Sequence, residues 1–260
     1  MLTDASRAQG RSARSGLRRP PSTRSSWVRR HPSAILLAVQ LAGVLLYPFL
    51  DAAVPAGRVV FELFGAVVLA LAVLSVRTSP GPTWLAVVLG VSASGLSIAD
   101  ALSGAPLLPL LAAILHALFY FWAAGSLMRY MLADNDVSRD ELFAVGATFT
   151  LVAWGFAYVF TALQLVSPHS FTAAVHADHP RTWMELLFLS FTNLSSTGLS
   201  DVAPITPYSR AVVMIEQLAG LAYVALFVSR VVGLTVNRRR AIEDGAEASA
   251  PAEQGTEHRS

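Results

Sequence analysis

The pattern of apolar and polar positions divides the chain into long apolar blocks joined by polar segments. Six blocks occur, at residues 33–50, 59–76, 83–103, 106–128, 142–166 and 208–236. Their lengths lie near or above the roughly 20 residues that a helix needs to cross a bilayer core of about 30 Å. Pro and Gly mark the short turns between the first four blocks. The pattern predicts an all-α integral membrane protein with six transmembrane helices.

Composition supports a membrane environment. Hydrophobic residues make up 54% of the chain and charged residues only 14%, with a mean hydropathy of +0.53, whereas a soluble domain needs more charge on its surface. The chain has no Cys, which excludes disulfides and thiolate metal sites. The sequence pI is near 9.3, but the Arg residues cluster beside apolar blocks, which indicates membrane topology and not nucleic-acid binding.

The distribution of Arg predicts the orientation of the six helices. With the N-terminus inside, sixteen Arg lie on the inner side, and only Arg58, Arg181 and Arg210 lie on the outer side. Positive charge accumulates on the cytoplasmic side of membrane proteins. We therefore predict a multi-pass protein of the plasma membrane with both termini in the cytoplasm.

The two ends of the chain differ from the apolar middle. Residues 1–32 are rich in Ser, Pro and Arg, and residues 237–260 begin with Arg and continue with Glu, Ala and Gly. Such segments bury too little apolar surface to fold, so we predict a disordered Arg-rich N-terminus and a disordered tail. The fourth block lacks the repeated basic residues of a voltage sensor. Residues 33–130 are therefore predicted to form a four-helix transmembrane scaffold.

A different pattern follows the fifth block. Polar residues 169–182 lead into Trp183–Leu194, which as a helix measures about 18 Å and is too short to span. Next comes Ser195–Asp201, in which most residues are small or polar, and residues 208–236 form the last apolar block. Irregular backbone at membrane depth is tolerated only where it is buried in protein or lines a water-filled cavity. The order of segments predicts a helix, a re-entrant pore loop and a second helix.

The predicted re-entrant loop has the chemistry of a cation site. The C-terminal end of a short helix carries a partial negative charge, which favours a cation beside it. Backbone carbonyls in the loop replace part of the cation's hydration shell. Channel-like function is therefore the first hypothesis for this part of the chain.

The end of the short helix and the loop after it carry a recognisable motif, formed by Ser190, Phe191, Leu194, Gly198, Asp201, Pro204 and Pro207. These positions match without a gap the pattern Ser-Phe-x-Thr-Leu-Thr-Thr-Val-Gly-Tyr-Gly-Asp-Ile-x-Pro-x-x-Pro. Through them, residues 183–234 resemble the pore module of the bacterial two-transmembrane ion channel family, within the potassium channel superfamily. The resemblance implies an ion channel pore domain at 139–236, a homotetramer, and passive flow of potassium with no other cofactor.

The resemblance also implies a selectivity filter, which is degenerate here. The filter comprises Ser196, Thr197, Gly198, Leu199 and Ser200, where the family has Thr-Val-Gly-Tyr-Gly. The carbonyls of Ser196 to Leu199 and the Ser196 hydroxyl are expected to form the ion ladder, and Gly198 to allow a positive φ. Ser200 replaces the second Gly, so we expect a left-handed residue there at a cost of about 1–2 kcal/mol. Leu199 replaces a Tyr whose hydroxyl braces the filter.

Other residues are candidates for supporting roles. Ser195, Asp201 and Glu216 are predicted to support the filter, although Glu216 also suits a protonated or paired carboxyl between helices. Gly220 is a candidate gating hinge, with Gly233 as a weaker one, and close helix packing is the alternative for both. Glu185 suits the start of the short helix. The outer histidines, His169, His176 and His179, fit a solvated loop better than a metal or pH site.

The predicted partners are other copies of the chain and the lipid bilayer, with no nucleic acid and no metal beyond permeant cations. Two other functions remain open. A non-conducting, channel-like sensor or scaffold protein would explain the altered filter. A membrane hydrolase would need a nucleophile and a base, and Ser200-Asp201 lacks the Gly-x-Ser-x-Gly elbow. We therefore predict that the protein is not an enzyme.

Overall fold

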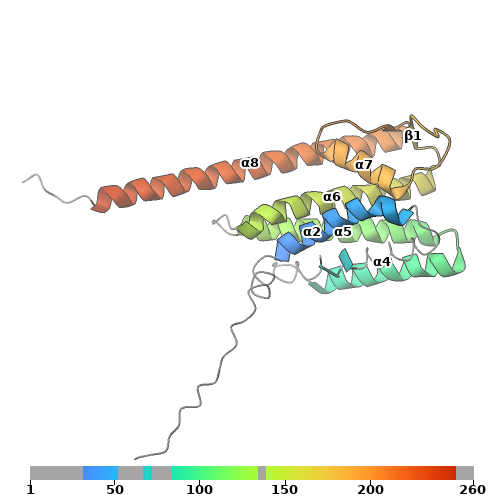
Figure 1. Cartoon of the computed structure of the whole chain (residues 1–260), viewed down its shortest axis with the longest axis horizontal. Helices are drawn as coiled ribbons and strands as arrows, with labels where there is room; N and C mark the ends of the chain where they lie inside the picture. Colours follow the sequence, from blue (N-terminus) through green and yellow to red (C-terminus); the bar gives the residue numbers. More distant parts are fainter. Residues whose placement is uncertain (1–31, 52–66, 69, 72–82, 134–138, 250–260) are drawn as a thin grey trace, which may run out of the picture.

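A computed structural model of the chain describes residues 32–51, 67–68, 70–71, 83–133 and 139–249 (Figure 1). Its elements are α2 (Pro32–Asp51), α4 (Thr83–Ser103), α5 (Leu108–Ala133), α6 (Arg139–Val166), β1 (Phe171–Ala173), α7 (Trp183–Leu194), β2 (Val202–Pro204) and α8 (Pro207–Ser249). Within these residues, five helices are long and apolar enough to cross a membrane: α2, α4, α5, α6 and the first part of α8. The prediction of a helical, multi-pass membrane protein is confirmed.

The predicted helix ends agree closely with the structure where residues are described. The predicted spans 33–50, 83–103, 106–128 and 142–166 correspond to α2, α4, α5 and α6. Most of the predicted span 59–76 lies outside the described residues, as do residues 1–31. A helix at 59–76 and disorder at 1–31 therefore stay predictions.

Helix α6 lies at the centre of the fold. It contacts α2 and α5 on one side and α7 and α8 on the other, and α4 packs on α5 (Figure 1). Small residues allow close approach: a Cβ at Gly146 of α6 would come within 2.9 Å of the Leu37 side chain of α2. The large side chains that are fully buried include Phe119 and Tyr120 of α5. The scaffold and the short helix therefore share one packed core.

The last helix is longer than the sequence predicted. Helix α8 continues to Ser249, past the expected end at residue 236, and extends beyond the other helices in Figure 1. The prediction of a disordered tail from residue 237 is therefore wrong for 237–249, and residues 250–260 lie outside the described part. The physical reason is local: Arg, Ala, Ile and Glu follow, and most of these are good helix formers.

Two short strands correct the all-α prediction. Strand β1 pairs antiparallel with β2, with Phe171 opposite Pro204 and Ala173 opposite Val202. The Ser170 carbonyl also accepts hydrogen bonds from the Ile205 N–H at 3.0 Å and the Ser209 hydroxyl at 2.9 Å. Three residues are too few for an alternating pattern to reveal a strand. The pairing joins the segment before α7 to the segment after the predicted filter.

The first turns of α2 and α6 meet at one end of the bundle. The Ser33 backbone N–H and hydroxyl donate to the Asp140 carboxylate at 3.2 and 2.9 Å. At the same end, Arg230 of α8 lies 3.7 Å from Glu141 of α6. Helices that start at the same end are separated by an even number of crossings. The geometry therefore implies an even number of crossings between residues 33 and 139, and the number four stays a prediction.

Candidate functional site

The start of α7 is fixed by a capping box. The Glu185 backbone N–H donates to the Thr182 hydroxyl at 3.3 Å, and the Thr182 backbone N–H donates to Glu185 Oε2 at 2.6 Å. Two N–H groups that have no helical partner are thereby satisfied. The prediction that Glu185 starts this helix is confirmed.

Arg181 organises the loop that precedes α7. Its side chain is 1% exposed and donates to the carbonyls of Val175, His176 and His179 and to the Glu185 carboxylate. Its backbone bonds in both directions with the side-chain amide of Gln164 in α6, at 2.8 and 2.9 Å. The sequence suggested only a charge on the outer side, because a single Arg gives no signal of the carbonyls around it.

Replacing Arg181 with Lys is expected to destabilise the protein by about 1–3 kcal/mol, because a compact ammonium group cannot reach carbonyls that a planar guanidinium bridges. The measurement is the free energy of unfolding in detergent micelles. The control is Arg210→Lys, since Arg210 is exposed and its side chain donates to the Pro204 carbonyl at 3.3 Å. Equal effects of the two substitutions would contradict the anchoring role of Arg181.

The first residues of the predicted filter segment cap the C-terminal end of α7. Ser195 is the C-cap, and Ser196 adopts φ 58°, in the left-handed region. The Ser196 N–H donates to the Asn193 carbonyl at 3.0 Å, and the Thr197 N–H to the Thr192 carbonyl at 2.9 Å. This pair of bonds is a Schellman motif, which usually places Gly at the left-handed position.

The left-handed strain predicted at Ser200 is therefore wrong. Among the described residues, positive φ occurs at Ser196 and not at Ser200, and the Ser200 hydroxyl accepts a hydrogen bond from the Val202 N–H at 3.0 Å. The physical reason is that the C-terminal cap of α7 determines which residue takes a positive φ, and this residue is not the one that aligns with the family's second Gly. The strained residue lies four positions earlier, at the start of the filter segment.

Gly198 is a second turning point in the loop. Its φ is 62°, as predicted for this glycine, and its N–H donates to the Thr192 carbonyl at 3.1 Å. The same carbonyl also accepts from the Thr197 hydroxyl at 3.3 Å and the Ser195 hydroxyl at 3.4 Å. Hydrogen bonds to carbonyls in the last turn of α7 thus fix the conformation of the first half of the loop.

The loop itself is exposed, whereas the helix beneath it is buried. Residues 195–199 are exposed, and Leu199 is 77% accessible, while Thr192 and Asn193 are buried. The Asp201 side chain is exposed and makes no hydrogen bond with the described residues. Asp201 therefore does not support the filter through a hydrogen bond to α7 within one chain.

Glu216 lies behind α7 in a polar contact shared by three helices. Its carboxyl is fully buried, and Oε1 lies 2.5 Å from the Ser190 hydroxyl of α7. The Ser190 hydroxyl also lies 2.8 Å from the Ala153 carbonyl of α6. The Asn193 side chain faces the same carboxyl group, although Asn193 Nδ2 and Glu216 Oε2 make no hydrogen bond of standard geometry with described residues. The contact joins α6, α7 and α8 at one point.

Replacing Ser190 with Ala is expected to lower the free energy of unfolding by about 1–3 kcal/mol, because the buried Glu216 carboxyl then loses its hydroxyl partner. The double variant Ser190→Ala, Glu216→Leu should recover most of that loss, since removing both polar groups leaves none unsatisfied. Ser229→Ala is the control, because the Ser229 hydroxyl is exposed and bonds only within its own helix. A double variant less stable than Ser190→Ala alone would contradict this account.

Gly220 lies directly against the end of α7. A Cβ on Gly220 would stand 2.0 Å from the Leu194 carbonyl oxygen and 2.8 Å from its carbon. No such contact exists at Gly233, where a Cβ would meet nothing within 4 Å. Close packing, the alternative interpretation of Gly220, is thus present in the structure, and the hinge stays a prediction.

The structure brings most predicted site residues together and adds others. Ser195 to Leu199 follow α7, and Glu216 and Gly220 reach its back from α8. Ser190 was matched to the family motif without a role, and Thr192 was not singled out, although a polar residue inside an apolar helix was a usable signal. The outer histidines stay apart from this site: His176 and His179 stack at 5.4 Å, and the described residues hold no group of three or more metal-binding side chains.

Comparison with known proteins supports the same segment. A family described as ion channel matches residues 146–237, from the first part of α6 to α8, which is about a third of the chain. No curated protein matches the chain. No solved structure matches it either. The structure and the family match together define a multi-pass membrane protein with an ion-channel-like segment.

Proposed function

We propose that the chain forms a tetrameric cation channel that conducts potassium passively through a filter of backbone carbonyls. The observation that carries the proposal is the short buried helix α7, which lies between α6 and α8 and ends in an exposed polar loop. Such a loop needs protein or water around it at membrane depth. Further copies of the chain around a central axis would surround the loop with protein and enclose a water-filled pore.

The electrostatics of α7 favour a cation at the loop. The helix ends in carbonyls that carry partial negative charge, and the loop that follows it contributes no side-chain cation. Ser196 and Gly198 both have positive φ. The N–H groups of Thr197 and Gly198 both donate to the Thr192 carbonyl, so the carbonyls of Ser196 and Thr197 point away from the end of α7. Four such loops, with the carbonyls of Ser196, Thr197, Gly198 and Leu199, replace the hydration shell of a potassium ion.

Residues of two kinds support the proposed filter: some pack against α7 from α8, and others lie in the loop itself. The Ser190–Glu216 contact fixes α7 relative to α8, and Gly220 sets the distance between them. Ser195 bonds to the Thr197 hydroxyl at 3.1 Å and stiffens the first turn of the loop. Asp201 gives the mouth a negative charge, and a ring of four carboxylates attracts cations.

The membrane arrangement follows from the charge pattern. Both termini lie in the cytoplasm of a plasma-membrane protein, and residues 33–130 form a scaffold, of which α2 and α5 pack on one side of α6. The aromatic contacts of Trp183 with Tyr47 of α2, at 5.9 Å, and with Trp154 of α6, at 5.4 Å, link this scaffold to the start of α7.

A non-conducting sensor or scaffold is the second candidate function. The observation that favours it is the filter sequence, in which Leu199 is exposed without a bracing hydroxyl and Ser200 bonds to its own turn. A loop with fewer fixed carbonyls binds ions less well. This candidate predicts assembly without conduction.

The test is ion flux with the full-length protein in liposomes. The proposal predicts a cation current that reverses near the potassium equilibrium potential in mixed potassium and sodium, and no chloride current. A tetramer mass in detergent is the independent measure of assembly. A folded tetramer without flux in any cation gradient would favour the sensor, and a strictly monomeric protein would overturn both functions.

A further inference from the structure

Ser190 of α7 has more hydrogen-bond partners than its hydroxyl proton can serve. Its Oγ lies 2.8 Å from the Ala153 carbonyl oxygen of α6 and 2.5 Å from Glu216 Oε1 of α8. A serine has a single O–H to donate, and a backbone carbonyl can only accept. The Ser190 proton therefore serves either Ala153 or Glu216, and the other contact needs a proton from a different group.

Glu216 is the group that can supply this proton. If Glu216 were ionised, both of its oxygens would be acceptors, and one of the two short contacts of Ser190 would join oxygen atoms with no proton between them. A protonated Glu216 removes this conflict, because its O–H donates to Ser190 Oγ while the Ser190 O–H donates to the Ala153 carbonyl. The two hydrogen bonds then run from α8 through α7 to α6.

The surroundings of Glu216 also favour a neutral acid. Its side chain is 0% exposed, and it lies about 14 Å along the axis from the first residue of α8. Among the residues that the structure describes, none forms an ion pair with it. A buried carboxylate is costly unless a cation accompanies it, whereas a neutral carboxyl needs only hydrogen bonds.

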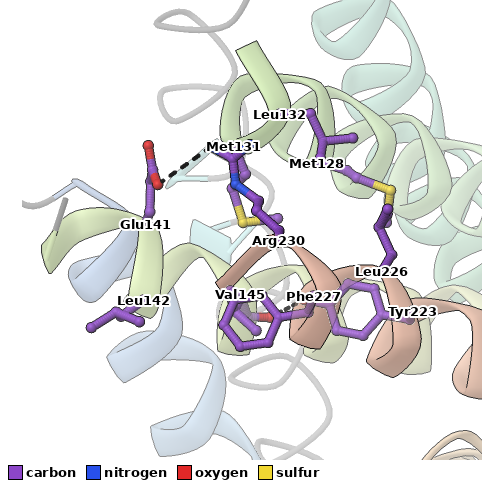
Figure 2. A pocket seen from close by; sticks show the side chains of 10 residues that line it. All are labelled: Met128, Met131, Leu132, Glu141, Leu142, Val145, Tyr223, Leu226, Phe227 and Arg230. Atoms are coloured by element: carbon purple, nitrogen blue, oxygen red, sulfur yellow. Dashed lines mark hydrogen bonds and ion pairs between the residues drawn. The ribbon is translucent and has the colours of Figure 1, made fainter. Parts of the chain in front are cut away.

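The titratable side chains nearest to Glu216 along each helix are bound elsewhere or lie far along the axis. On α7, Glu185 belongs to the capping box in the first turn. On α6, Tyr158 stacks on a histidine of α5 at 4.5 Å. On α8, the exposed Arg210 lies about 9 Å before Glu216 and Tyr223 about 10 Å after it. The Tyr223 hydroxyl donates to a carbonyl of α6 at 2.6 Å, as Figure 2 shows.

Glu141 provides a contrast within the same protein. It is 7% exposed, and Arg230 Nη2 lies 3.7 Å from its Oε2, beside the pocket between α5, α6 and α8 (Figure 2). An arginine, which is always protonated, thus accompanies the one acid. A serine and an asparagine, both neutral, accompany Glu216. The partners of Glu216 can satisfy an acid but cannot neutralise a charge.

We infer that Glu216 is a neutral acid in the folded protein and donates its proton to Ser190, which passes the contact on to Ala153. Glu216 is therefore a positioning residue, and its proton holds α7 between α6 and α8. Loss of this proton at high pH breaks one of the two hydrogen bonds and loosens α7 beneath the loop of residues 195–199. The inference refines the support that the proposed function gives to Glu216, and its test needs no ion flux, so the two can fail separately.

The test is infrared spectroscopy of the full-length protein in liposomes at neutral pH. A protonated carboxyl has a C=O band that a carboxylate lacks, and the band shifts in heavy water. The difference spectrum between wild type and Glu216→Gln should contain one such band. Glu185→Gln is the control and should leave that band in place, because Glu185 accepts from the Thr182 N–H and pairs with Arg181. A carboxylate signal in place of the acid band would overturn the inference.

Ser190→Ala identifies the band without requiring that Glu216→Gln folds. The acid loses the acceptor of its O–H in this variant, so the Glu216 band should move to higher frequency. A band that stays at the same frequency in Ser190→Ala would show that the proton is not donated to Ser190, which also overturns the inference.

The pH dependence of stability gives a second readout. An exposed Glu is ionised at neutral pH, so unfolding releases the proton that the folded chain holds at Glu216. Stability therefore falls as the pH rises, and the unfolding constant of wild type should increase about tenfold per pH unit near pH 7, relative to Glu216→Gln, whose amide does not titrate. The measurement is guanidinium unfolding in detergent micelles. Parallel pH profiles of the two proteins would contradict a neutral Glu216.

Discussion

Replacing Gly198 with Ala is expected to reduce cation flux by more than about a thousandfold. The glycine has φ 62°, and an L residue there costs about 1–2 kcal/mol. In the proposed tetramer this cost falls on four loops at once, so the conducting arrangement loses about 4–8 kcal/mol. The measurement is the flux per folded tetramer in liposomes.

Gly104 offers a matched control for Gly198. It also has φ 62°, and a Cβ there would also meet nothing within 4 Å, but it lies between α4 and α5. Gly104→Ala should therefore lower stability to a similar degree and leave the flux per folded tetramer unchanged. If both substitutions reduce the flux equally, strain in the chain explains the loss and the loop is not the conduction path.

Replacing Gly220 with Ala is expected to give the largest loss of stability. The new Cβ would lie 2.0 Å from the Leu194 carbonyl oxygen, and that atom is backbone, so no side chain can rotate away. Overpacking in a well-packed core costs about 1–3 kcal/mol, and a rigid backbone neighbour places this case at or above the upper limit. The measurements are the thermal midpoint in detergent and the flux.

Gly233 lies on the same helix and isolates the clash. Ala is a better helix former than Gly by about 1 kcal/mol, so Gly233→Ala should stabilise the helix slightly. The two substitutions share this gain and differ in the contact with Leu194. A Gly220→Ala protein as stable as Gly233→Ala would mean that α8 does not pack on α7 in the membrane.

Much of the fold was predictable because membrane helices leave a strong signal. Length and hydropathy placed α2, α4, α5 and α6 within a few residues, and a bilayer of fixed thickness explains that accuracy. The end of α8 was missed because the apolar pattern stops near residue 236 while helix propensity continues. A block of apolar residues marks the part of a helix that lies in lipid. Where the helix continues outside the lipid, its residues are polar and this signal ends.

The candidate site was predictable in sequence position and less so in geometry. Gly198 was expected at positive φ and has it, whereas the strain expected at Ser200 occurs at Ser196. A resemblance aligns residues, but the end of a helix is decided by which carbonyls accept the next N–H groups, here those of Thr192 and Asn193. The role of Ser190 appears only when α6, α7 and α8 are seen together.

The pairing of β1 with β2 has a consequence for how this chain can vary. Strand β1 pairs with β2, with Phe171 opposite Pro204, so the two ends of the intervening segment stay fixed relative to each other. The entropic cost of closing such a loop depends on its length and changes little with its sequence. Sequence changes in the loop after α7, such as Leu199-Ser200, can therefore arise without displacing the ends of this segment, from which α6 and α8 continue.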